Sequence, residues 1–153
     1  MKLSHVDQAG RARMVDVGDK PLMDRTAVAA GAIQMTRDAF QQVADQAVAK
    51  GDVLAVSEVA GTLAAKRTAE LIPLCHPLGL DHVAVDASLD ETLPGVRVRA
   101  TVRTVGRTGV EMEALTAVSI ALLTVYDMVK AADPGMVIVD VQLVKKQKVP
   151  IDT

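Results

Sequence analysis

The sequence has few aromatic residues, one cysteine and no excess of positive charge. Aromatic residues make up 1% of the 153 residues, namely Phe40 and Tyr126, whereas apolar residues make up 50%. Readers of single-stranded nucleic acid stack the bases on aromatic side chains, and duplex binding depends on positive charge. The chain has 17 basic and 19 acidic residues, a net charge of -2. We therefore expect no nucleic-acid partner.

The lone cysteine, Cys75, excludes an intrachain disulfide, and three histidines alone are too few for a four-ligand structural zinc site. We expect a reducing compartment, no metal and no resident cofactor. Residues 1–13 lack the apolar run of a secretory signal. The most apolar stretch, 114–129, contains Thr, Ser and Asp residues, so it differs from a clean membrane span. The sequence predicts a cytoplasmic protein without membrane association.

The length is typical of one domain, and no low-complexity segment or long Pro/Gly-rich linker divides the chain. We expect residues 1–153 to form a single domain with flexible tails at 1–13 and 147–153. The hydropathy pattern predicts the order β-α-α-β-β-α-β. The predicted elements are a strand at 25–35, helices at 36–50 and 52–71, strands at 83–89 and 96–102, a helix at 110–131 and a strand at 137–143.

The predicted strands alternate apolar and polar residues, with Val137, Val139, Val141 and Leu143 expected on one face of the last strand. Parallel strands buried on both faces would be apolar throughout, so an antiparallel sheet with helices on one face fits better. We expect an α+β fold of the ferredoxin-like type. The arginines of 96–103 then lie on the other face, which is either solvated or covered by a packing partner.

The predicted helix 110–131 carries its polar residues on one narrow stripe. At 100° per residue, less than half of the circumference holds Glu113, Thr116, Ser119, Thr124, Asp127 and Lys130. A helix so apolar elsewhere is buried in the protein or in an oligomer interface, and its stripe is expected to line a cleft. Asp127 and Lys130, three residues apart, form either an ordinary surface ion pair or a partly desolvated acid–base pair.

Residues 71–80, LIPLCHPLGL, place Cys75 and His76 between Pro73 and Pro77. Proline fixes the backbone, so this segment presents its side chains rigidly. His76 is either a buried structural histidine or a donor to an anion. Basic residues are either solvated or part of a local phosphate pocket; they include Lys50, Lys66, Arg67, Lys130, Lys145, Lys146 and Lys148.

Three stretches resemble the MoaC family, the cyclic pyranopterin monophosphate synthases of molybdenum cofactor biosynthesis. They are MVDV at 14–17, AAKRTAELIPLCHPL at 64–78 and TGVEMEALTAVSIALLTVYDMVKA at 108–131. The resemblance extends over roughly residues 4–146. It implies a ferredoxin-like subunit in a homohexamer, a trimer of dimers with active sites at the dimer interface.

The resemblance also implies an activity. The family converts 3′,8-cyclo-7,8-dihydro-GTP, a small-molecule substrate received from a radical SAM enzyme, into cyclic pyranopterin monophosphate with release of pyrophosphate. Carried over to this chain, the catalytic residues are Asp127, Lys130, Lys50 and His76. The substrate-binding residues are Leu74, Cys75, His76, Met112, Glu113 and Lys146, with Arg25, Lys66 and Arg67 as further candidates.

The chain departs from the family near its end. Lys146 is followed by QKVP, where members of the family carry a glycine-rich stretch suited to holding an anion. Either Lys145, Lys146 and Lys148 bind phosphate by charge alone, or activity is altered. The rival interpretation is a non-catalytic oligomeric module of ferredoxin-like fold that binds a nucleotide or a partner protein. It would need neither Asp127 nor Lys130.

Overall fold

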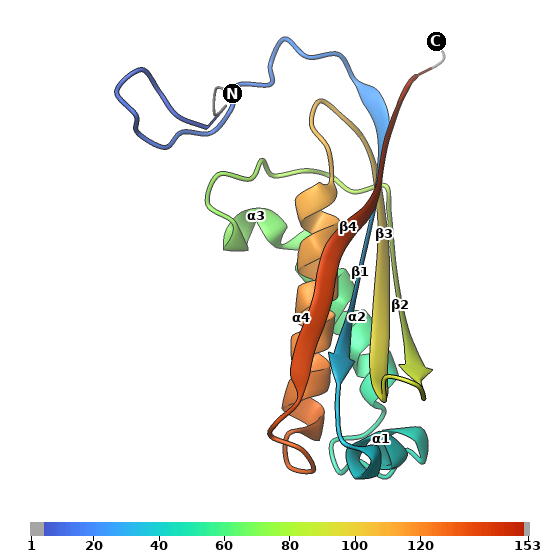
Figure 1. Cartoon of the computed structure of the whole chain (residues 1–153). Coiled ribbons are helices and arrows are strands. Elements are labelled where there is room, and N and C mark those ends of the chain that lie inside the picture. The colour runs from blue at the N-terminus through green and yellow to red at the C-terminus, as the bar shows by residue number, and fades with distance from the viewer. Residues whose placement is uncertain (1–4, 152–153) are drawn as a thin grey trace.

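The computed structural model describes residues 5–151 and shows four strands and four helices in that range (Figure 1). In chain order these elements are β1 (Met23–Gln34), α1 (Arg37–Ala44), α2 (Val53–Lys66), α3 (Thr68–Leu71), β2 (His82–Asp90), β3 (Gly95–Gly106), α4 (Glu111–Val129) and β4 (Val137–Pro150). The predicted α+β class is confirmed, and the predicted order is correct except for the additional short helix α3.

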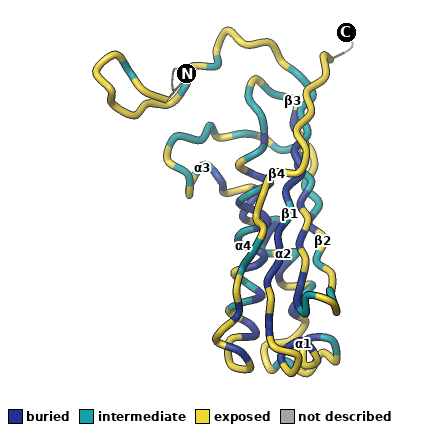
Figure 2. The backbone as a smooth tube through the Cα atoms, in the orientation of Figure 1, coloured by how far each residue is buried: buried dark blue, intermediate teal, exposed yellow. Residues whose placement is uncertain are grey.

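The four strands form one antiparallel sheet in the order β2-β3-β1-β4. Helices α2 and α4 pack together and cover one face of this sheet (Figure 1). The core between the two layers consists of small and branched residues, as the scarcity of aromatic residues requires. Figure 2 shows the buried residues concentrated along β1, β3 and the inner side of α4.

The opposite face of the sheet carries the arginines of β3. Arg97, Arg99 and Arg103 are exposed, and two of them pair with acidic residues on neighbouring strands. Arg103 contacts Asp24 at 2.9 Å, and Arg97 contacts Asp90. Within residues 5–151 no helix covers the arginine face of the sheet, and acidic side chains neutralise two of its three arginines.

The first predicted helix is shorter than expected. Thr36 caps α1 by accepting a hydrogen bond from the Ala39 amide, as predicted, but the helix ends at Ala44 rather than Lys50. Gln46 adopts a φ of 53°, in the left-handed region, which cannot continue a right-handed helix. Residues 45–50 therefore form turns, and these turns carry Lys50 to the C-terminal end of α4.

The second predicted helix is divided in two. Asp52 caps α2 by accepting from the Ala55 amide, as predicted, but α2 ends at Lys66 and α3 follows after Arg67. Arg67 has φ and ψ of -109° and 12°, outside the helical region. This break turns the chain before Pro73 and directs the segment 72–80 across the N-terminal end of α4.

Helix α4 is long and apolar enough to cross a membrane by length and composition alone, yet most of its apolar side chains are buried against α2 and the sheet. Its close contact with α2 depends on Gly61. A Cβ atom at Gly61 would lie 2.9 Å from the Ala117 carbonyl oxygen and 3.0 Å from a Val85 methyl group. The absence of a side chain thus lets the two helices approach.

We expect Gly61→Val to lower the free energy of unfolding by about 1–3 kcal/mol, the usual cost of overpacking a close-packed site. Chemical denaturation would measure this loss. Ala55→Val, at an exposed position of the same helix, introduces the same β-branched side chain without the clash. Valine has a higher helix propensity than glycine, so propensity cannot lower the stability of Gly61→Val. A loss no greater in Gly61→Val than in Ala55→Val would show that the contact with α4 does not limit the side chain at this position.

Strand β4 differs from its prediction in two ways. Register shifts between Val28 and Ala29 and between Ala30 and Ala32, with Asp140 at a φ of 56°, interrupt its pairing with β1. Val139 pairs with Ala32 and Leu143 with Ala29, which point to opposite faces, so the four apolar residues do not share one face. The strand also extends to Pro150, so 147–150, expected in a flexible tail, pair with 23–26.

Candidate active site

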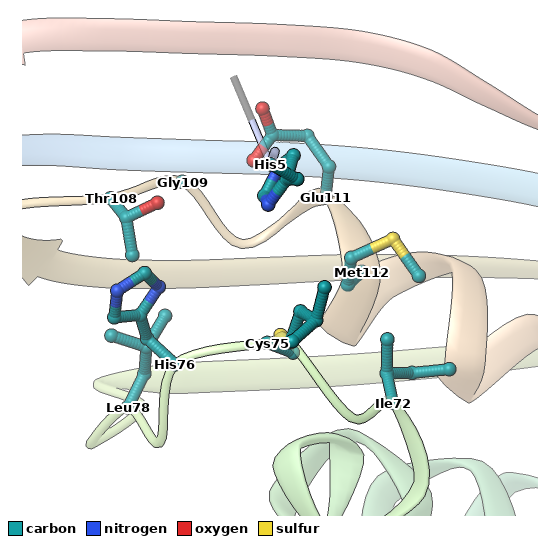
Figure 3. A pocket seen from close by; sticks show the side chains of 10 residues that line it. His5, Ile72, Cys75, His76, Leu78, Thr108, Gly109, Glu111 and Met112 are labelled. Atoms are coloured by element: carbon teal, nitrogen blue, oxygen red, sulfur yellow. The ribbon is translucent and has the colours of Figure 1, made fainter. Parts of the chain in front are cut away.

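A cavity of about 490 Å³ lies between the segment 72–78 and the start of α4 (Figure 3). We call it the inner cavity. Its size is within the roughly 300–1,000 Å³ of small-molecule sites. It is lined by His5, Ile72, Leu74, Cys75, His76, Leu78, Thr108, Gly109, Glu111 and Met112. The structure therefore brings together the predicted residues Leu74, Cys75, His76 and Met112.

His76 is held by the backbone of the N-terminal segment. Its Nε2 lies 2.6 Å from the Val15 carbonyl oxygen. A carbonyl oxygen only accepts, so Nε2 carries a proton and donates it, and Nδ1 is the ring nitrogen left to contact a ligand. The His76 side chain is half-buried and fixed in orientation. Such a ring can exchange a proton with a ligand through its second nitrogen.

Half-buried Cys75 and buried Glu113 form a pair beside this cavity. The Cys75 thiol donates to Glu113 Oε1 at 3.7 Å, while Glu113 Oε2 is buried without a partner in the described chain. Burial, reinforced by the neighbouring Glu113 carboxylate, raises the pKa of the Cys75 thiol to about 11. Burial also raises the pKa of Glu113. Cys75 thus remains a thiol at neutral pH and serves as a donor rather than a nucleophile.

A second cavity of about 660 Å³ adjoins the inner cavity, and the two share Thr108, Gly109 and Glu111. We call it the basic cavity, because five cationic side chains line it. These are Lys20, Arg25, Arg107, Lys146 and Lys148. Five cations around one cavity produce a positive potential that favours a polyanion.

Two contacts organise the basic cavity. Arg25 donates to the carbonyl oxygens of Gly106 at 2.9 Å and of Arg107 at 3.1 Å, which ties β1 to the loop before α4. Lys146 pairs with Glu111. Burial tends to raise the pKa of Glu111, but the hydrogen bond and charge of Lys146 outweigh it and lower the pKa. Glu111 is therefore an anion that neutralises one of the five cations.

The other predicted catalytic residues form a separate cluster at the C-terminal end of α4. Lys50 Nζ lies 2.7 Å from Asp127 Oδ2 and 2.9 Å from the Asp127 carbonyl oxygen, and Lys130 Nζ lies 2.7 Å from Asp127 Oδ1. The hydrogen bonds that Lys130 and Lys50 donate lower the pKa of Asp127 to about 2, and the bond that Lys130 donates to Asp127 raises the pKa of Lys130. The three side chains are about half exposed. We call them the Asp127 cluster.

The Asp127 cluster does not meet the two cavities within one chain. Glu111 and Asp127 are at opposite ends of α4, about 24 Å apart at 1.5 Å per residue. The predicted polar stripe is therefore divided: Glu113 and Thr116 are buried, whereas Asp127 and Lys130 are exposed. Between them, the hydroxyls of Ser119 and Thr124 donate to carbonyl oxygens one turn back. The expectation that one cleft follows the stripe is wrong for the single chain.

The remaining predicted residues lie at the margins of these sites. Lys66 lines a further cavity on the other side of the segment 72–80, together with Asp81 and His82. Arg67 is exposed at the break between α2 and α3. Lys145 lies on the opposite side of β4 from Lys146 and Lys148, because side chains alternate along a strand. Only the latter two line the basic cavity.

Several residues of the two cavities escaped prediction from the sequence. They are His5, Lys20, Arg107, Thr108 and Glu111. Glu111 and Thr108 lie close in sequence to the predicted residues Met112 and Glu113, and this proximity is the only feature of the sequence that indicates a role for them. Lys20 and His5 come from a segment without periodicity. Across residues 5–151, no group of three or more His, Cys, Asp or Glu side chains is placed to hold a metal ion.

Known proteins resemble the chain over most of its length. The model of the MoaC family matches residues 14–148. A cyclic pyranopterin monophosphate synthase of Roseiflexus sp. (strain RS-1) is 58% identical over 144 residues, which cover 94% of this chain and 91% of that protein.

Proteins of the same name from two further bacteria are similar to the chain. The protein of Cereibacter sphaeroides (strain KD131) is 55% identical and that of Dinoroseobacter shibae is 54% identical. These alignments cover 95% and 94% of this chain and 91% of each relative. The chain belongs to the MoaC family.

Proposed function

We propose that this protein is a cyclic pyranopterin monophosphate synthase, which converts 3′,8-cyclo-7,8-dihydro-GTP into cyclic pyranopterin monophosphate and pyrophosphate. The observation that carries the proposal is the junction of the two cavities. The inner cavity offers His76 and the Cys75 thiol, which donates to Glu113 behind it, and the adjoining basic cavity offers five cations. A substrate with a guanine-derived ring system at one end and a triphosphate at the other matches this pair of cavities.

The triphosphate is assigned to the basic cavity. Its charge of several units requires several cations, and Lys146 and Lys148 project from β4 into this cavity although the glycine-rich stretch of the family is absent. A paired strand holds these two lysines in register with Ala27 and Arg25. Side chains on a strand can thus neutralise phosphates without a loop of backbone amides.

We expect Lys146→Gln combined with Lys148→Gln to raise KM at least tenfold, because each charge-assisted hydrogen bond to phosphate is worth about 1.5–3 kcal/mol. The measurement is steady-state kinetics at low and physiological salt, and binding by the variant should depend less on salt. Lys145→Gln is the matched control, because Lys145 lies outside the cavity. If Lys145→Gln weakened binding as much, general surface charge rather than the cavity would hold the phosphates.

The chemistry requires proton transfer and stabilisation of charge. Rebuilding a guanine into a pterin moves several protons, and a hydroxyl must attack the α-phosphorus as pyrophosphate leaves. His76 can exchange protons through Nδ1, and Lys130 and Lys50, aligned by Asp127, can donate to developing negative charge. The proposed catalytic residues are accordingly Asp127, Lys130, Lys50 and His76.

These catalytic residues meet only if two copies of the chain combine. Two copies related by a two-fold axis across α4 would run antiparallel, so the C-terminal end of α4 in one would lie beside the cavities of the other. Large apolar side chains are exposed on the helical layer and on β4, and an interface would cover them. They include Val56, Val59, Leu63, Leu123, Val141 and Leu143. We propose a ferredoxin-like subunit in a homohexamer of three dimers, in the cytoplasm.

The test is incubation of the protein with the upstream radical SAM enzyme, GTP and SAM, followed by detection of the pterin product. Product should form only when both proteins are present, and pyrophosphate should appear in equal amount. A protein that bound GTP but gave no product would instead be a non-catalytic nucleotide-binding module.

A further inference from the structure

The N-terminal segment has a defined conformation over residues 5–13. The Asp7 carboxylate accepts hydrogen bonds from the amides of Ala9 and Arg11, both at 2.9 Å, and from Arg11 Nε at 3.0 Å. The Arg13 amide donates to the His5 carbonyl oxygen at 2.9 Å, and Val6 forms a β-bridge with Ala12. These contacts close a small hairpin, which we call the N-terminal hairpin, with His5 at its base.

The N-terminal hairpin is attached to the candidate active site. Val15, two residues beyond Arg13, accepts the hydrogen bond of His76 at 2.6 Å. Asx turns and a β-bridge fix the hairpin locally, and the His76 contact fixes its place relative to the segment 72–78. The position of His5 is thereby coupled to a proposed catalytic residue.

His5 lines the inner cavity, although the N-terminal segment that carries it extends away from the sheet (Figure 1). In Figure 3 its imidazole lies beside the Glu111 side chain, with Thr108 to its left and Cys75 and Ile72 below it in the view. Glu111 and Thr108 are two of the three residues shared by the inner and basic cavities. An imidazole at this junction faces the part of a ligand that connects the two cavities.

We propose that His5 is a substrate-binding residue, which hydrogen-bonds to the substrate between its ring system and its phosphates. The inference rests on the proposed function for the identity of the substrate. An imidazole can donate or accept there, whereas the nearby Glu111 is engaged by Lys146. Because the N-terminal hairpin carries His5, this hairpin also forms one wall of the cavity around the bound substrate.

The first test is chemical modification of the full-length protein with diethyl pyrocarbonate, with mass spectrometry to follow each histidine. GTP serves as the probe, because it has a guanine ring and a triphosphate. The chain has three histidines, and His82 on the exposed face of β2 is the internal control. GTP should slow modification of His5 severalfold and leave His82 unaffected. An unchanged rate at His5 would overturn the proposal.

The second test is kinetic and uses the product assay. His5→Phe retains a planar ring without hydrogen-bonding groups and should raise KM roughly three- to tenfold, the cost of one hydrogen bond. His5→Gln retains a donor and an acceptor and should recover most of the affinity, which a purely structural role would not explain. His82→Gln controls for the loss of a histidine elsewhere. Kinetics of His5→Phe equal to those of the parent would contradict the assignment, whereas absence of product from the unmodified protein would contradict the proposed function instead.

Discussion

Asp127→Asn is expected to reduce product formation by roughly 10²- to 10⁴-fold, the usual loss when one positioned proton-transfer or charge-stabilising group is removed. The Asp127 carboxylate bridges Lys50 and Lys130 and fixes the direction of both ammonium groups. An amide would keep the shape but lose the charge that orients them. Lys130→Ala should cause a loss of similar size.

Neither substitution should unfold the protein. The side chains of the Asp127 cluster are about half exposed, and exposed ion pairs contribute little to stability. Circular dichroism and sedimentation of both variants would check the fold and the assembly. Asp24→Asn is the matched control, because it breaks another exposed ion pair, with Arg103, on the face of the sheet away from the helices. Turnover near that of the parent in Asp127→Asn would show that the assignment is wrong.

The lowered pKa of Asp127 predicts how the cluster responds to acid. A carboxyl whose pKa falls from its ordinary value of 3.8 to about 2 on folding favours the folded state above pH 4. This contribution is lost as the pH falls from about 4 through 2. Asp127 is therefore ionised throughout the neutral range, so loss of activity between pH 5 and 7 must come from another group.

Much of the fold could be predicted because the local patterns agree with the packing. The alternating β2–β3 hairpin and the cap residues Thr36 and Asp52 behave as expected from sequence. The errors occur where one backbone angle decides the outcome. Gln46 and Asp140 adopt positive φ, and hydropathy does not encode this choice in residues other than glycine. Gln46 ends a helix, and Asp140 changes the register of a strand, although the hydropathy pattern continues through both residues.

The sequence names individual candidate residues for the site but does not predict their arrangement in space. A helical wheel places Glu113 and Asp127 on one stripe, but it does not show their separation along the helix axis. That separation is about 21 Å. It therefore suggested one cleft where the chain has two separate clusters. The basic cavity likewise depends on the alternation of Lys145, Lys146 and Lys148 about a bulged strand. Sequence alone fixes neither the bulge nor the side of each lysine.

The Asp127 cluster and the two cavities lie at opposite ends of α4, and this separation leads to the second prediction. Two variants that are each inactive should regain activity when their subunits are mixed. Asp127→Asn damages the C-terminal end of α4, and His76→Ala damages the inner cavity. If each active site takes one end from each of two subunits, a mixed dimer has one site with both defects and one intact site. Random pairing makes half of the dimers mixed, so activity should return to roughly a quarter of the parent's.

The experiment is co-expression of the two variants, with separately tagged subunits to verify mixing, followed by the product assay. Mixing Asp127→Asn with Lys130→Ala is the control, because both changes lie in the Asp127 cluster and every site of a mixed dimer then contains one defect. That mixture should remain inactive. Activity that stayed at the level of the separate variants in the His76→Ala mixture, despite verified mixing, would show that sites are not shared in this way. Activity near a quarter there, and none in the control, would mean that α4 of one subunit supplies Asp127 to the cavities of its partner.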